Sequence, residues 1–325
     1  MTWNERVAAL SDLDLTKRQA GFLATVMLHS GVCMGRQYCA YAGIEYGRKM
    51  VDFFGLLLAR GYVTARPCGN QNARLYHVHH RPLYRAIGQE DNRHRKPMAL
   101  SRAVERLMLL DAVLADRDCN WLATEQEKVA HFTLRLPVAR QDLPQTTYRG
   151  TDSETTRYFP DKLPVAVDQD GRTHVFMYLV TRPEPGDFRG FLERHAELLR
   201  AVPSWSIRLL VPRHFTGALP AYQLAFQEQV ASPLRPIVLD ELRWYFHARR
   251  DGANAAEERF HHAVGAFGAP RFAALYRAWL ERGEPVLDAT LSPTLMDAIG
   301  RGAGGLDCHV LAHRYLHLLP LVGTA

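Results

Sequence analysis

The stretch from residue 46 to residue 78, YGRKMVDFFGLLLARGYVTARPCGNQNARLYHV, constrains the fold more than any other part of the chain. Apolar residues recur at helical spacing up to residue 60, and Gly61 is the kind of residue that commonly ends a helix. Two short β-type runs follow, residues 62–64 and 74–78, around a tip (66–73) whose Gly and Asn residues favour a tight turn. A helix followed at once by an arginine-bearing hairpin is typical of a winged helix-turn-helix.

Two further helices precede this stretch. Thr16 and Gln19 have the spacing of a capping box, which predicts a helix that begins at Thr16 and ends near residue 30. A second helix is expected over residues 36–42, closed by Gly43, and the third over residues 44–60. In the third helix, the residues expected to form the buried stripe are Met50, Val51, Phe54, Leu57 and Leu58. Those expected to face outward are Arg48, Lys49 and Asp52.

Positive charge gathers over the same part of the chain. The protein has 40 Lys and Arg residues against 34 Asp and Glu, and residues 17–106 hold 15 basic and 5 acidic residues, a net charge of +10. Such a surface neutralises phosphates and releases their counterions, which drives salt-sensitive binding to DNA. The sequence therefore predicts double-stranded DNA as the partner, with the helix over residues 44–60 in the major groove.

The expected contacts follow from this placement. Arg48 and Lys49 are expected to contact base edges or flanking phosphates, because Arg fits guanine bidentately, and Tyr46 belongs to the same set. Arg36 and Gln37 are expected to contact backbone phosphates. The hairpin is expected to contact the backbone or minor groove through Arg66, Asn70, Gln71 and Arg74. Residues 81–97 read as an exposed segment, either a solvated linker or a DNA-contacting arm through Arg93, Arg95 and Lys96.

Composition bounds the remaining possibilities. A chain of 325 residues with 47% apolar residues is long enough for two or three packed domains. The five cysteines form no CxxC pair, so a zinc site of the usual spacing is not expected, and no apolar run is long enough for a membrane span. We expect a cytoplasmic, nucleoid-associated protein.

The spacing of apolar residues changes from helical to β-type after residue 132. Short β-type runs over 133–139, 155–159, 163–167 and 173–180 are followed by a helix over 187–202 and a buried strand over 206–212. The pattern is helical from residue 239 onward. We therefore expect an α+β chain with a winged helix-turn-helix over residues 1–80, a basic linker and helix over 81–132, an α/β domain over 133–235 and a helical C-terminal region over 236–325.

Three motifs point to a family. LTKRQAGFL at 15–23, GYV at 61–63 and the run Tyr158-Phe159-Pro160-Asp161, followed by two β runs and a helix, resemble the replication-relaxation type of protein encoded by plasmids and integrative elements. The resemblance covers residues 12–215 in outline. It implies a winged helix joined to a domain related to the PD-(D/E)xK nucleases.

The catalytic part of that resemblance is incomplete. Pro160-Asp161 fits the first motif, but the next strand reads THVFMYLV, with Met177, Tyr178 and Leu179 where Glu, any residue and Lys are required. A water-activating metal site needs converging carboxylates, so we expect a nuclease-like scaffold without catalytic residues. His309, His313 and His317 do not change this expectation, because positions eight residues apart in a helix are separated by about 12 Å. His77, His79 and His80 are expected near phosphates, and neither a metal nor a cofactor is predicted.

These features predict a transcriptional regulator of a bacterial mobile element that binds DNA as a homodimer. The helical C-terminal region is expected to serve dimerisation or contact with a partner protein. Two alternatives stay open: a metal-dependent nuclease or replication and mobilisation initiator, and an adaptor that holds a transposition or conjugation complex together.

Overall fold

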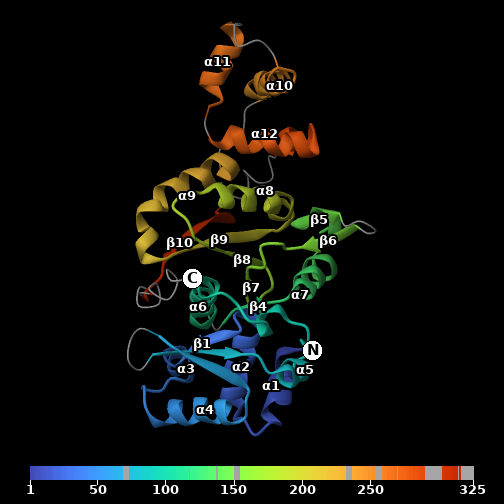
Figure 1. Ribbon diagram of the computed structural model, residues 1–325. Helices are drawn as coiled ribbons and strands as arrows, with labels where there is room; N and C mark the ends of the chain where they lie inside the picture. The colour runs from blue at the N-terminus through green and yellow to red at the C-terminus, as the bar shows by residue number, and fades with distance from the viewer. Residues whose placement is uncertain are drawn as a thin grey trace. The chain divides into compact units, whose positions relative to one another are not determined.

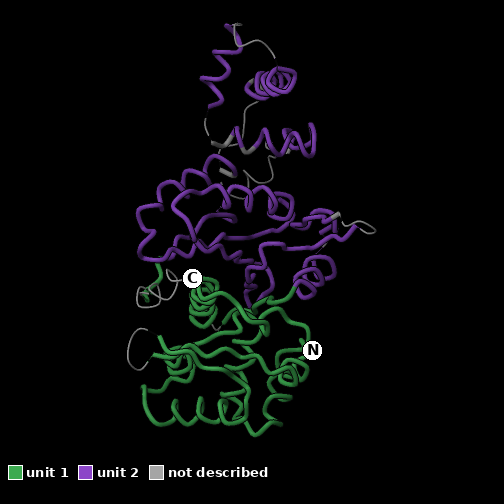
Figure 2. The backbone as a smooth tube through the Cα atoms, viewed as in Figure 1, with its two compact units in different colours: residues 1–124, 310–325 green, residues 125–309 purple. Residues whose placement is uncertain are grey.

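The computed structural model describes residues 1–325 apart from 69–72, 117, 137, 150–153, 232–235, 253–257, 269, 290–301, 314 and 316–325. The chain is an α+β protein (Figure 1). It divides into two compact units, residues 1–124 together with 310–325, and residues 125–309 (Figure 2). This division differs from the four segments expected from the sequence.

Unit 1 combines helices with a small antiparallel sheet. Its elements are α1 (Trp3–Ser11), α2 (Lys17–His29), β1 (Val32–Met34), α3 (Gly35–Ala42), α4 (Arg48–Ala59), β2 (Val63–Pro67), β3 (Arg74–Val78), α5 (Arg81–Ala86), the 3-10 turn η1 (Arg93–Arg95), α6 (Leu100–Ala115) and β4 (Asn120–Leu122). The strand order is β1-β3-β2, and β3 is antiparallel to both neighbours.

Local sequence signals set the helix ends. Thr16 and Gln19 form both halves of the expected capping box: each backbone N–H donates to the other residue's side chain, at 3.3 and 2.9 Å. Gly43 and Gly61 have φ angles of 63° and 66°, the left-handed conformation that glycine adopts without strain. The predicted ends at Thr16, Gly43 and Gly61 are therefore confirmed. The third helix begins at Arg48, however, and not at residue 44 as expected.

An aromatic cluster holds α4 against the rest of unit 1. The Tyr38 ring of α3 stacks on Phe53 of α4 at 4.3 Å, and Phe54 stacks on Tyr76 of β3 at 3.9 Å. The Phe22 ring of α2 lies 5.2 Å from Tyr38. All five rings are buried. The position of α4 is thus set by two helices and the sheet together.

The segment after the hairpin is packed rather than extended. Residues 81–86 form α5, and His94 of η1 is buried. Gly31, at φ +76°, allows the close approach of η1, because a Cβ atom there would lie 2.4 Å from the His94 carbonyl oxygen. Arg106 of α6 donates to the Ser30 carbonyl at 3.1 Å and lies 2.6 Å from His94 Nδ1. The expectation of an exposed segment over residues 81–97 is therefore wrong for its central turn.

Unit 2 contains a mixed sheet and two groups of helices. Its strands are β5 (Gln145–Arg149), β6 (Glu154–Tyr158), β7 (Val165–Val167), β8 (Thr173–Leu179), β9 (Ser204–Val211) and β10 (Gly304–Val310). Its helices are α7 (Glu125–Ala130), α8 (Gly186–Ala201), α9 (Leu219–Phe226), α10 (Pro236–Arg250), α11 (Glu258–Ala266), α12 (Pro270–Arg282) and α13 (Pro285–Ala289). Its short turns are η2 (His131–Arg135), η3 (Arg140–Asp142), η4 (Arg213–Ala218) and η5 (Gln227–Ala231).

The sheet of unit 2 is organised around β8. It pairs with β7 antiparallel and with β9 parallel, and β10 follows β9. The helix α8 connects the parallel pair, and α8 and α9 lie on the same face of the sheet (Figure 1). The strand and helix expected over 173–180 and 187–202 are thus confirmed to within a residue.

Two predicted elements of unit 2 are wrong. Residues 131–135 form a π-helical turn where a strand was expected over 133–139. Residues 304–310 form β10 where a helix was expected. Trp205 N–H donates to the Ala303 carbonyl at 2.7 Å, and a Cβ atom at Gly304 would lie 2.6 Å from the Trp205 indole, so a larger residue would not fit. His309 is exposed on this strand, His313 follows it in a bend, and His317 lies outside the described residues.

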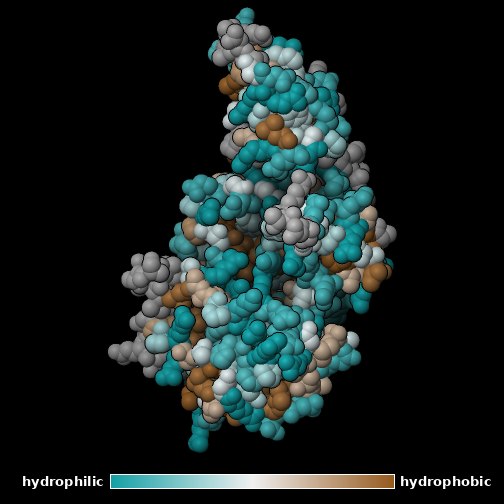
Figure 3. All heavy atoms as spheres, turned by 45° about the vertical axis from the view of Figure 1, so that its right-hand side comes forward, coloured by the Kyte–Doolittle hydropathy of each residue, from teal (hydrophilic) through white to brown (hydrophobic). Residues whose placement is uncertain are grey.

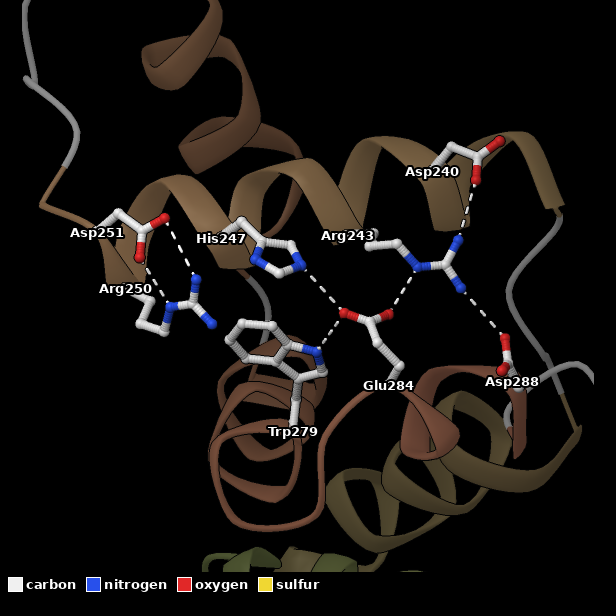
Figure 4. A network of polar contacts seen from close by, with 8 residues as sticks. All are labelled: Asp240, Arg243, His247, Arg250, Asp251, Trp279, Glu284 and Asp288. Atoms are coloured by element: carbon white, nitrogen blue, oxygen red, sulfur yellow. Dashed lines mark hydrogen bonds and ion pairs between the residues drawn. The ribbon is translucent and has the colours of Figure 1, made fainter.

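The helices α10 to α13 pack around a core of their own. Figure 4 shows Glu284 between α12 and α13 at the centre of their polar network. Its carboxylate accepts hydrogen bonds from Arg243 Nε at 2.7 Å and Trp279 Nε1 at 3.0 Å, and His247 Nε2 lies 3.0 Å away. Burial opposes the ionised form, but these hydrogen bonds lower the pKa of Glu284 overall. The network ties α10 to the end of α12.

Candidate nucleic-acid interface

The outer face of α4 presents charge to solvent. The Arg48 side chain is 94% exposed and its Nε lies 3.7 Å from Asp52 Oδ2, a side chain that is 66% exposed. Such an exposed i, i+4 pair is weak and opens readily. Lys49 is also exposed, and the prediction that Arg48, Lys49 and Asp52 face outward is confirmed.

Small residues lie on both sides of Arg48 on this face. Gly55 has open space around the position of a Cβ atom, and Ala59 is exposed one turn further along. Val51 is 59% exposed, so its expected place in the buried stripe is wrong. At about 100° per residue, the positions of Val51, Gly55, Arg48, Ala59 and Asp52 cover one continuous arc of roughly 100°. The helix therefore has a shallow outer face that another surface can approach closely.

Tyr46 flanks the start of this face. Its ring is exposed just before Gly47, the N-cap of α4, which makes no side-chain capping hydrogen bond. The ring packs beside the start of α3, where a Cβ atom at Gly35 would lie 3.3 Å from Tyr46 Cε2. Backbone N–H groups at the beginning of a helix are unpaired within it and suit an anion.

The β2–β3 hairpin adds two arginines near its tip. Arg66 is opposite Leu75, and Arg74 is opposite Pro67, one step closer to the turn. Both arginines are exposed, and because neighbouring positions alternate they point to opposite faces of the hairpin. Within the described residues, Lys49, Arg66 and Arg74 have no ion pair. Asn70 and Gln71 lie outside the described residues.

Arg36 and Gln37 have a different role from the expected phosphate contacts. Both nitrogens of the Arg36 fork bind the Asp111 carboxylate, at 2.8 and 2.7 Å. Gln37 is fully buried and donates to Asp111 Oδ1 at 2.8 Å and to the Leu107 carbonyl at 3.1 Å. Tyr315 O–H donates to the same carboxylate. This polar cluster fixes α3 on α6, and Gln37 has no surface to offer a ligand.

The three cations considered as an arm do not extend from the protein together. Arg93 is partly buried, and this burial, with Arg106 and Arg102 nearby, lowers its pKa to about 10. Arg95 Nε donates to the Glu90 carbonyl at 3.2 Å. Lys96 is exposed. The expectation of a DNA-contacting arm is not supported by this packing.

The sequence positions that suggested a nuclease form no metal site in unit 2. Asp161 Oδ1 is paired with Arg194 Nη2 at 2.5 Å. Met177, Tyr178 and Leu179 are buried in the sheet. In the part of the chain that the structure describes, no group of three or more His, Cys, Asp or Glu residues is placed to hold a metal ion.

The chain was compared with protein-family models, curated proteins and solved structures, and none of them matches it. Figure 3 shows a mostly hydrophilic face with separate hydrophobic areas. Among the described helices, none has the length and apolarity that crossing a membrane requires.

Proposed function

We propose that unit 1 is a winged helix-turn-helix that binds duplex DNA sequence-specifically, and that the protein is a transcriptional regulator acting as a dimer. The helix α4 lies in the major groove, and the β2–β3 hairpin acts as the wing. An α-helix with its side chains is about 10–12 Å wide and matches the major groove of about 12 Å. We also propose, from the resemblance to replication-relaxation proteins, that a bacterial mobile element encodes the protein.

The observation that carries the proposal is the outer face of α4. Arg48 is almost completely exposed, with small residues on both sides of it, and Lys49 has no ion pair within the described residues. This face belongs to the part of the sequence with a net charge of +10. Exposed cations on a shallow helical surface favour phosphate and base-edge contacts.

The contact set differs from the one expected from the sequence. Arg48 reads a base edge, and Lys49 contacts a flanking phosphate. Arg66 and Arg74 contact the backbone on the wing side, and Tyr46 flanks the N-terminus of α4. Arg36 and Gln37 hold α3 in place and act on DNA only through its position.

Selection of bound duplexes from a random pool tests the proposal. We expect one enriched sequence, arranged as an inverted repeat if the protein binds as a dimer. Arg48→Ala should weaken binding to it by about 1–3 kcal/mol and relax specificity at one base pair. Arg172→Ala is the matched control, since Arg172 is an exposed arginine in a turn of unit 2. Unchanged affinity in Arg48→Ala, or an equal loss in the control, would contradict the assignment.

A further inference from the structure

Val51 is an exposed apolar side chain at one edge of the outer face of α4. It is 59% exposed on α4, although valine is usually buried. It lies on the outer face with Arg48, one turn before it, and Gly55, one turn after it. Phe53, Phe54 and Leu57 of the same helix are almost completely buried, and Leu56 and Leu58 are partly buried.

The surroundings of Val51 select the kind of group that can cover it. Arg48, on the same face, attracts a negatively charged surface, while the two methyl groups of Val51 require an apolar one. In the major groove of DNA, the base edges present hydrogen-bonding groups and one apolar group, the 5-methyl group of thymine. A negatively charged DNA duplex with a thymine methyl group opposite Val51 satisfies both requirements.

We propose that Val51 reads the 5-methyl group of a thymine, an inference that rests on the proposed DNA-binding function. Side chains three residues apart on a helix are about 5–6 Å from each other, and successive base pairs are about 3.4 Å apart. The thymine therefore lies within one or two base pairs of the base that Arg48 contacts. The bare surface at Gly55 lets the helix approach closely enough for a methyl contact.

The test compares thymine with deoxyuridine, which differs only by lacking the methyl group. Each thymine of the selected duplex is replaced singly by deoxyuridine, and dissociation constants are measured for the full-length protein. Wild type should bind one of these duplexes about fourfold more weakly, the factor for one buried methyl-sized group. Val51→Ala should bind the thymine and deoxyuridine forms equally, because the partner of the methyl group is gone.

A matched variant controls for loss of an exposed valine as such. Val264 of α11, in unit 2, is 42% exposed, and Val264→Ala should keep the fourfold difference. Thermal unfolding should show that both variants fold as wild type does, since neither side chain is buried.

The outcomes separate this inference from the proposed function. If wild type binds every deoxyuridine duplex as tightly as the selected thymine duplex, the role of Val51 is overturned and the proposal of DNA binding is left intact. The same holds if Val51→Ala retains the full difference, or if it changes self-association and leaves DNA affinity untouched. Failure to enrich any duplex would overturn both.

Discussion

Asp111 is the centre of the polar cluster that fixes α3, so its replacement tests how unit 1 is held together. Its carboxylate accepts both bonds of the Arg36 fork, one bond from Gln37 and one from Tyr315. The side chain of Asp111 is only 14% exposed. Burial opposes the ionised form of Arg36, but Asp111 raises the pKa of that guanidinium overall.

The magnitude follows from the groups that Asp111→Ala leaves behind. Breaking a buried ion pair by removing one partner costs about 3–5 kcal/mol, and an unsatisfied buried polar group costs about 1–3 kcal/mol. Arg36 is partly exposed and regains water, whereas the amide nitrogen of Gln37 is fully buried and keeps only its bond to the Leu107 carbonyl. The Gln37 side-chain oxygen still accepts the Met34 backbone N–H at 2.9 Å. We therefore expect Asp111→Ala to lower the free energy of unfolding by about 3 kcal/mol.

Urea denaturation measures this loss as a lower midpoint at an unchanged slope. Hydrogen exchange should locate the loss in α3 and α6. The matched control is Asp52→Ala, which removes the exposed partner of Arg48 and should cost less than about 0.5 kcal/mol. The double change Arg36→Ala with Asp111→Ala should cost less than the sum of the single changes, because both remove the same ion pair.

The effect should also reach the face of α4 that we propose to bind DNA. The Tyr38 ring of α3 stacks on Phe53 of α4, so a displaced α3 disturbs α4. A loss below about 1 kcal/mol, comparable to that of Asp52→Ala, would refute the reasoning. It would mean that water or a neighbouring group replaces the carboxylate without cost.

Two further predictions concern unit 2. Burial chiefly lowers the pKa of His195 to about 4, with Asp161 opposing the shift and Arg194 and Lys128 reinforcing it. Since an unfolded histidine titrates near 6.5, the folded state loses up to about 3 kcal/mol as pH falls from 6.5 to 4 and keeps its full stability above 6.5. Unfolding temperatures across this range should depend less on pH in His195→Gln than in wild type. A remainder should come from other buried histidines: burial also lowers the pKa of His131 to about 4, and it lowers the pKa values of His174 and His94. Equal pH dependence in the variant and in wild type would contradict this prediction. Asp161 forms an ion pair with Arg194, so we expect the protein not to nick supercoiled DNA in the presence of Mg²⁺. Asp161→Ala should lower the stability of the protein and have no other effect. Nicking that disappears in Asp161→Ala would restore the nuclease alternative.

The sequence by itself determined the features that depend on neighbouring residues. The capping box at Thr16 and Gln19 and the glycine stops at Gly43 and Gly61 were predictable because their partners lie within a few positions. The outward direction of Arg48 and Lys49 was predictable from helical spacing. Local patterns of apolar residues also predicted the order of helices and hairpin in unit 1 and the β8–α8–β9 segment of unit 2.

Tertiary structure decided the features that depend on distant residues. Gln37 is buried because Asp111, 74 positions away, accepts its hydrogen bond. Residues 304–310 form a strand because β9 supplies a pairing edge that overrides their helical pattern. Val51 faces outward because α3 and the sheet cover the opposite side of α4. A one-residue change in the position of the buried stripe is enough to expose a side chain that was expected in the core. Such choices depend on which surfaces meet in space, and no local pattern of residues contains that information.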